Sequence, residues 1–177
     1  MRVIAGAYGG RELRAPRGRA TRPTSDRMRE ALFSILGDVS GAHVLDLFAG
    51  SGALAIEALS RGAASATLVD TAPAAIAAIR RNLASVGVDV EVRRQPALSF
   101  LRNARSEGRH YDLVFLDPPY RHAQDLGTEL SLALVPVLTP DARVVCESDR
   151  RAPLELELPV LDQRSYGDTL ISIHGTQ

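Results

Sequence analysis

The spacing of apolar residues changes repeatedly along the chain, from short continuous runs to positions three or four residues apart. Continuous runs bounded by turn residues are typical of buried strands, and the wider spacing is typical of helices that cover them. The runs predict strands at 44–48, 66–70, 88–92, 112–116 and 142–147. The wider spacing predicts helices at 53–61, between a Thr71 cap and Gly87, at 96–104 and at 124–134. Strands and helices that alternate in this way form a mostly parallel sheet covered on both faces.

The amino end departs from this alternation. Residues 2–6 and 10–14 flank two adjacent glycines and predict a small β-hairpin. Prolines and glycines then interrupt the chain before the first helix. We therefore predict a small basic extension at 1–24, followed by one main domain at 25–177.

Two further patterns complete the predicted fold. A helix capped by Ser25 or Asp26 has a continuous apolar face and ends at Gly37. Residues 154–158 and 169–173 alternate strictly between apolar and polar, which predicts a final antiparallel hairpin. The fold class is therefore α/β, although these patterns leave the order of the strands open.

Composition limits the class of protein. The chain has 177 residues, of which 45% are hydrophobic and 24% charged, as expected of one soluble globular domain. Cys146 is the single cysteine and lies in an apolar run, so we expect a buried thiol and no disulfide within the chain. The sequence has no signal-peptide pattern and no long apolar stretch, so we expect a cytoplasmic protein. The four histidines lack metal-ligand spacing, so we expect no metal site.

The net charge of zero conceals a basic amino-terminal segment. Residues 1–30 carry eight arginines against three acidic residues, a net charge of +5 that the rest of the chain balances. Arginine meets phosphate groups with paired hydrogen bonds and stacks on bases, and the chain contains no lysine. We therefore expect RNA or DNA contacts from Arg2, Arg11, Arg14, Arg17, Arg19, Arg22, Arg27 and Arg29. A solvated, disordered tail is the alternative.

A glycine turn follows the predicted strand at 44–48. Gly50 and Gly52 allow the backbone to turn tightly and approach a ligand before the next helix begins. Asp70 ends the second strand, where an acid can accept hydrogen bonds from the two hydroxyls of a ribose. A carboxylate at Asp46 would repel a pyrophosphate but accept from an amino group, such as that of S-adenosylmethionine. An adenosine-type cofactor is predicted, with a nicotinamide cofactor or a purely structural turn as alternatives.

The sequence Asp117-Pro118-Pro119-Tyr120 follows the apolar run at 112–116. Ligands of open α/β sheets bind outside the carboxyl ends of the strands, so we expect this acid to face a pocket. The prolines end the strand and leave carbonyl groups free, and Tyr120 offers a ring on which a base can stack. Asp117 and the Pro118 carbonyl suit the two N–H bonds of an exocyclic amine on a nucleobase, which they would orient for alkylation. A strand-terminating turn with a chance tyrosine is the alternative.

Longer blocks of the sequence resemble one bacterial family from end to end. They lie at 2–6, 10–13, 22–33, 46–54 and 57–63, and they include Asp117-Pro118-Pro119-Tyr120 and Tyr166-Gly167-Asp168-Thr169. On these blocks the chain resembles RsmD, the family of bacterial 16S ribosomal RNA guanine-N2 methyltransferases. Many amino-methyltransferases share the glycine turn and the Asp-Pro-Pro-Tyr sequence, whereas the block at 22–33 is far more specific.

The resemblance implies a class I methyltransferase fold, with a seven-stranded, mostly parallel sheet and S-adenosylmethionine bound at the glycine turn. The implied cofactor residues are Asp46, Phe48, Gly50, Ser51, Gly52, Asp70 and, in a block that closes over the cofactor, Thr24. Relatives tend to have Asn or Asp where Pro96 stands, which removes a side-chain bond to the adenine. We expect backbone atoms of Ala97, or else Gln95, to take its place.

The resemblance also implies the reaction and the partner. Asp117, Pro118, Pro119 and Tyr120 would hold the target guanine of 16S ribosomal RNA, within the 30S subunit or an assembly intermediate. We expect a monomer with no membrane partner. Two rival functions stay open, namely methylation of another amine such as adenine N6 in DNA or RNA, and nucleotide or RNA binding without this catalysis.

Overall fold

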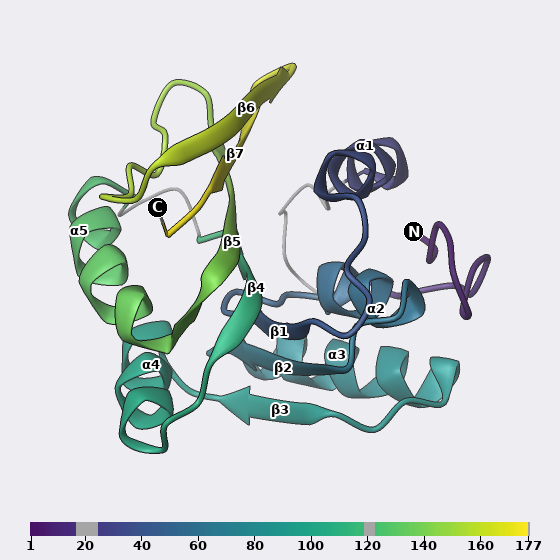
Figure 1. Cartoon of the computed structure of the whole chain (residues 1–177). Coiled ribbons are helices and arrows are strands. Elements are labelled where there is room, and N and C mark those ends of the chain that lie inside the picture. The colour runs from purple at the N-terminus through teal and green to yellow at the C-terminus, as the bar shows by residue number, and fades with distance from the viewer. Residues whose placement is uncertain (17–24, 119–122, 177) are drawn as a thin grey trace. The chain divides into compact units, whose positions relative to one another are not determined.

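The computed structural model describes residues 1–16, 25–118 and 123–176. The chain divides into two compact units, Met1–Gln95 and Pro96–Gln177, and each contains both helices and strands (Figure 1). No helix in the described part of the chain is long and apolar enough to cross a membrane.

The first unit contains parallel strands with helices packed against them (Figure 1). Its elements are α1 (Asp26–Leu36), β1 (His43–Asp46), α2 (Ala53–Ser60), β2 (Ser65–Asp70), α3 (Pro73–Val86) and β3 (Glu91–Arg94). The strand order is β3-β2-β1, with α2 against β1 and β2, and α3 against β2 and β3. The core of this unit is made of fully buried aliphatic residues that include Val44, Leu45, Ile56, Leu68 and Ile79.

The second unit combines one parallel strand pair with an antiparallel hairpin. Its elements are α4 (Ala97–Ser106), β4 (Tyr111–Leu116), α5 (Ala123–Leu134), the short 3-10 helix η2 (Val135–Val137), β5 (Leu138–Asp149), β6 (Val160–Tyr166) and β7 (Thr169–His174). The strand order is β4-β5-β7-β6, in which β4 and β5 are parallel and the other neighbours are antiparallel. The predicted class, an α/β fold with mostly parallel strands and an antiparallel carboxyl-terminal hairpin, is confirmed.

The first arm of that hairpin was placed too early by the sequence pattern. Residues 154–158 are not a strand in the structure, and β6 begins only at Val160. Leu154 and Leu158 are buried at 3% and 8% exposure, as their alternation suggests. The alternation therefore reported correctly which side chains are buried, but not which element covers them.

Helix α5 is what residues 154–158 pack against. A Cβ atom added to Gly127 of α5 would lie 2.0 Å from the Glu155 carbonyl oxygen, so the two backbones meet closely at this glycine. The Glu157 N–H donates to the Ser131 hydroxyl at 2.8 Å. The backbone of this segment is thus bonded to a helix rather than to a neighbouring strand.

Two element boundaries differ from the sequence prediction for local reasons. β3 begins at Glu91 and is half-buried or exposed throughout, whereas the predicted strand began at residue 88. Thr71 does not cap α3, because the helix starts at Pro73 with Ala72 as its N-cap residue. The Asp70 carboxylate instead accepts from the Ala72 N–H at 2.8 Å.

The amino-terminal segment, residues 1–16, packs on the helices of the first unit, to which it belongs. Arg2 and Glu12 form an antiparallel bridge, and the Val3 N–H donates to the Arg11 carbonyl at 2.9 Å. Val3 and Leu13 are buried at 1% and 4% exposure. A solvated tail is therefore excluded for these residues, although the strand pairing is limited to an isolated bridge.

Candidate active site

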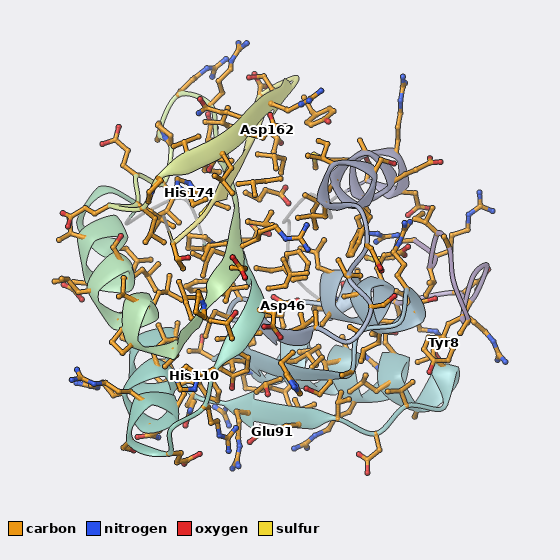
Figure 2. The ribbon with its side chains drawn as sticks, viewed as in Figure 1. Tyr8, Asp46, Glu91, His110, Asp162 and His174 are labelled. Atoms are coloured by element: carbon orange, nitrogen blue, oxygen red, sulfur yellow. The ribbon has the colours of Figure 1, made fainter. Side chains whose placement is uncertain are left out.

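β1 ends at Asp46, which is labelled in Figure 2, and the turn at residues 47–52 leads from it into α2. Gly50 and Gly52 in this turn have φ angles of 55° and 78°, which residues with a side chain adopt only with strain. The Gly50 N–H donates to Asp70 Oδ2 at 3.0 Å, so the turn is bonded to the end of β2. A Cβ atom on Gly52 would lie 2.8 Å from Leu68 Cδ2. The backbone conformation therefore favours glycine at both positions, and at Gly52 a side chain would also force Leu68 to shift.

Asp46 is buried, with 3% of its surface exposed, and its carboxylate accepts hydrogen bonds from the backbone of Phe48 and Ala55. Ala55 lies in the first turn of α2, whose N-cap residue Gly52 has no side chain, so Asp46 takes over the role of the cap. Burial raises the pKa of Asp46 to about 7, repulsion from Asp70 adds to the rise, and the two backbone bonds oppose it. A cation placed beside this group would stabilise its charged form near neutral pH.

Asp70 is the last residue of β2 and is 5% exposed. One carboxylate oxygen accepts from the Gly50 N–H and the other from the Ala72 N–H. A carboxylate offers about four lone-pair positions, so these two bonds leave capacity for hydroxyl donors. The structure thus brings Asp46, the glycine turn and Asp70 together at the carboxyl ends of two neighbouring parallel strands, and contact with a ribose stays a prediction for Asp70.

The remaining predicted cofactor residues fall in three places. Phe48 is half-buried in the turn itself, and Ser51 lies between the two glycines. Thr24 lies outside the described residues. Ala97 is buried at the start of α4, where the N-cap residue Pro96 has no side-chain acceptor for the first N–H groups of the helix. Those backbone N–H groups are compatible with the predicted adenine contact, which no observation tests.

The third acid of the predicted site, Asp117, directly follows β4. Leu116, its last residue, is buried and pairs in parallel with Cys146 of β5. Asp117 follows directly and is half-buried, and Pro118 is buried. Pro119 and Tyr120 lie outside the described residues, so stacking of a base on Tyr120 stays a prediction.

The arginines of the amino-terminal region do not all share one environment. Arg2, Arg11, Arg14 and Arg27 are exposed, as phosphate contacts require. Arg17, Arg19 and Arg22 lie outside the described residues. The exposed arginines are carried by a packed segment and by α1, so their main-chain positions are fixed.

The prediction that Arg29 contacts RNA is wrong. Its side chain is fully buried on the core face of α1, where it donates to the Arg2 carbonyl oxygen and to Asp26 Oδ1, the latter at 2.8 Å. A guanidinium without exposed surface cannot meet a phosphate group. Arg29 instead joins α1 to the amino-terminal segment.

Two buried polar side chains that the sequence analysis missed also hold the amino-terminal segment. Glu57 of α2 has no exposed surface and accepts from the N–H groups of Ile4 and Ala5 at 2.7 and 3.1 Å. Asn82 of α3 accepts from the Arg14 N–H and donates to the Arg14 carbonyl, both at 2.9 Å. The available signal was a polar residue at a helix position otherwise reserved for apolar residues.

Other reactive side chains are placed unlike catalytic groups. Cys146 is fully buried, and burial raises its pKa to about 12, so its thiol stays protonated and inert. Among residues 1–16, 25–118 and 123–176, no group of three or more His, Cys, Asp and Glu side chains is arranged to hold a metal ion.

Comparisons with known proteins place the chain in a family. A family model described as "Conserved hypothetical protein 95" matches residues 1–175. The chain is 38% identical over 185 residues to the putative rRNA methyltransferase YlbH of Bacillus subtilis (strain 168), with 98% of each chain covered. It is 44% identical over 123 residues to the ribosomal RNA small subunit methyltransferase D of Escherichia coli (strain K12), a match that covers 68% of this chain and 61% of that protein. The solved structure of the putative methyltransferase yhhF from Escherichia coli has a TM-score of 0.84 at 34% identity and covers 100% of this chain and 98% of that chain. The chain therefore belongs to the Conserved hypothetical protein 95 family, which is the RsmD family that its sequence motifs predict.

Proposed function

We propose that this methyltransferase transfers the methyl group of S-adenosylmethionine to the exocyclic N2 amine of a guanine in 16S ribosomal RNA. The observation that carries the proposal is the arrangement at the ends of β1 and β2, where a buried Asp46, a glycine turn and Asp70 lie together. Family membership supplies the second support, because the relatives are named as ribosomal RNA methyltransferases.

The donor half of the proposed site follows from the charges at the turn. S-adenosylmethionine carries an ammonium group and a ribose with two hydroxyls. Asp46 would accept from the ammonium group, which favours its carboxylate form, and Asp70 would accept from the hydroxyls with its remaining lone pairs. A dinucleotide would instead bring its pyrophosphate against the two acids, which repel it. The acids thus favour a sulfonium donor over a nicotinamide cofactor.

The acceptor half of the proposed site is the end of β4. Asp117 and the Pro118 carbonyl would accept the two N2–H bonds of guanine, which orients the nitrogen lone pair toward the methyl group. The amine nitrogen attacks the methyl carbon, so a C–N bond forms while the C–S bond breaks and its electron pair stays on sulfur. The nitrogen then loses a proton to Asp117 or to water. Because the nitrogen becomes strongly acidic only as the methyl group arrives, Asp117 need not be a strong base.

RNA would be held by the exposed arginines of the amino-terminal region. Phosphate contacts fix the position of an RNA without reading its sequence, so these residues contribute affinity, and the pocket selects the base. The target guanine must leave its stack to reach the pocket, which costs least in an unpaired loop. We infer that the substrate is a loop of the RNA within the 30S subunit or an assembly intermediate, bound by a monomer in the cytoplasm.

Methyl transfer from labelled S-adenosylmethionine tests the proposal directly. Purified 30S subunits, free 16S RNA and double-stranded DNA, all from cells lacking this enzyme, are incubated in parallel, and the RNA is digested for mass spectrometry. We expect label in the ribosomal RNA at one guanine, as N2-methylguanine, and none in DNA. Label at adenine N6 or in DNA alone would overturn the proposed substrate, and the absence of S-adenosylhomocysteine binding would overturn the proposed donor.

A further inference from the structure

Asn82 is buried in the second half of α3, with 1% of its surface exposed. Asparagine is unfavourable in a helix interior because its side chain competes for backbone hydrogen bonds. A buried amide is also destabilising unless its hydrogen bonds are made. Nothing in the helix itself therefore explains an asparagine at this position, so the explanation lies in the groups that its side chain contacts.

The Asn82 amide joins two segments that are far apart in the sequence. Its Nδ2 group donates to the Ser51 carbonyl at 2.8 Å and to the Arg14 carbonyl at 2.9 Å. Its Oδ1 atom accepts from the Arg14 N–H at 2.9 Å. Both protons of the amide are thus used, one on the glycine turn and one on the amino-terminal segment.

The Ser51 carbonyl belongs to the peptide unit that shapes the donor turn. At the other end of that unit, the Gly52 N–H donates to the Ala49 carbonyl at 2.6 Å. The peptide plane is therefore held on one side by the turn itself and on the other by Asn82. Rotation of this plane would break at least one of the two bonds, so Asn82 restricts the turn to one conformation.

The Arg14 end of the link lies within the segment proposed to bind RNA. Both main-chain polar groups of Arg14 are bonded to Asn82, and the neighbouring Leu13 is buried at 4% exposure. The Arg14 side chain is exposed. Asn82 thus fixes the main chain and leaves the guanidinium available to a phosphate group.

On the basis of the function proposed above, we propose that Asn82 is a positioning residue that couples donor binding at the glycine turn to RNA binding by the amino-terminal segment. A donor bound at the turn reduces the residual motion of the Asn82 amide and of the Arg14 main chain bonded to it, so less conformational freedom is lost when RNA binds the Arg14 side chain. Linkage then requires the reverse effect, in which RNA raises the affinity for the donor by the same factor.

The coupling factor is measured as the Kd for a 16S RNA fragment without and with saturating S-adenosylhomocysteine. For the native protein we expect S-adenosylhomocysteine to lower the Kd for the RNA fragment by about fivefold or more. Asn82→Ala should bring this ratio close to one. Asn82→Asp keeps the acceptor for the Arg14 N–H but loses both donors, and should also lower the ratio.

Ser131→Ala is the matched control. Ser131 is also a buried polar residue on a helix, with 3% exposure, and it accepts from the Glu157 N–H at 2.8 Å. Ser131→Ala should lower the melting temperature by about as much as the Asn82 substitutions do, and it should leave the coupling ratio at the native value. A purely structural role for Asn82 predicts the same ratio in all variants.

An unchanged ratio in Asn82→Ala, or a native ratio of one, would overturn the coupling. Failure of the native protein to bind either S-adenosylhomocysteine or RNA would instead contradict the proposed function. Hydrogen exchange on the native protein tests the link even where the variants do not fold. S-adenosylhomocysteine should slow hydrogen exchange at the Arg14 N–H, which donates to Asn82 Oδ1, and an unchanged rate would overturn the link.

Discussion

The ends of β1 and β4 carry the same sequence pattern, an apolar strand followed by an acid, and yet the two acids stand in different environments. Asp46 is buried, caps α2 and accepts from backbone N–H groups. Asp117 is half-buried and precedes Pro118, which is followed by a second proline. Proline has no N–H group, so neither Pro118 nor Pro119 can donate a backbone hydrogen bond to Asp117, whereas Phe48, two residues after Asp46, donates one to Asp46. The residues that follow each acid therefore set how many backbone donors it meets, and the Asp46 oxygens serve the fold in addition to the proposed ammonium group.

The largest effect on activity is expected when the Asp117 carboxylate is removed. Asp117→Ala should lower kcat by about 1,000-fold, because it removes a group that acts on the reacting amine. The affinity for S-adenosylhomocysteine should stay close to the native value. Single-turnover transfer to 30S subunits and calorimetric titration measure the two quantities.

Asp112→Asn is the control for this variant, since it changes another half-buried carboxylate of β4, which accepts from the Thr139 hydroxyl at 2.9 Å. It should keep kcat near the native value. An alanine variant at Asp117 with full activity would refute the assigned role.

A change of pH should have an intermediate effect on the affinity for the donor, and this effect should depend on Asp46 and not on Asp117. With a pKa of about 7, Asp46 holds a proton below neutral pH and then cannot pair with the ammonium group of the donor. The Kd for S-adenosylhomocysteine should rise by about tenfold for each pH unit below 7 and level off above it. Titrations between pH 5.5 and about 8.5 measure the curve.

Asp46→Asn should give a Kd that does not change with pH, and Asp117→Asn should leave the native pH curve unchanged.

Ionisation of Asp46 should have the opposite effect on the stability of the fold. Because the folded pKa of Asp46 lies above its ordinary value of 3.8, ionisation disfavours the folded state, and this group lowers stability as pH rises from 3.8 to about 7, with no further loss above that pH. Asp46→Asn should therefore unfold at a higher temperature than the native protein at pH 8, and a lower unfolding temperature would contradict the raised pKa.

The smallest effect is expected at the turn that distinguishes the β1 end. Gly52→Ala adds a methyl group close to Leu68 in a left-handed conformation, and should lower the free energy of unfolding by more than the roughly 1–2 kcal/mol of backbone strain. Gly41→Ala is the control, because Gly41 has a φ of 76° and open space around its Cβ position. Urea unfolding of both variants separates strain from contact, and equal losses would exclude the Leu68 contact as a cause.

The fold was predictable where strands are buried on both faces, as in the fully buried run at 113–116. It was less predictable at β3, the first strand in the order, because valines alternate with acidic residues at 88–92 and the strand that forms, Glu91–Arg94, is half-buried or exposed. Residues 154–158 show a related difficulty. Their alternation of apolar and polar residues indicates which side chains are buried, but it does not indicate whether a strand or a helix covers them.

The candidate site was predictable to the extent that chain topology dictates it. Asp46 and Asp70 end neighbouring parallel strands, so their proximity follows from the βαβ pattern. Membership of a methyltransferase family, inferred from the sequence blocks, is confirmed by the comparisons.

The roles of Asn82 and Glu57 could not be predicted, because their partners are main-chain atoms distant in the sequence, which leave no residue pattern. Arg29 was misassigned because a count of charges ignores the helix face, although its position between buried Met28 and Leu32 indicates the core side.

The docking of residues 3–14 has a consequence for how the protein is made. Their partners Glu57 and Asn82 lie 53 residues after Ile4 and 68 residues after Arg14. A ribosome adds about 5–20 residues per second, so this segment waits for several seconds or longer before its docking surface exists. During translation residues 3–14, with Arg11 and Arg14, are therefore an undocked basic segment, and they pack on the folded enzyme only once α3 has emerged.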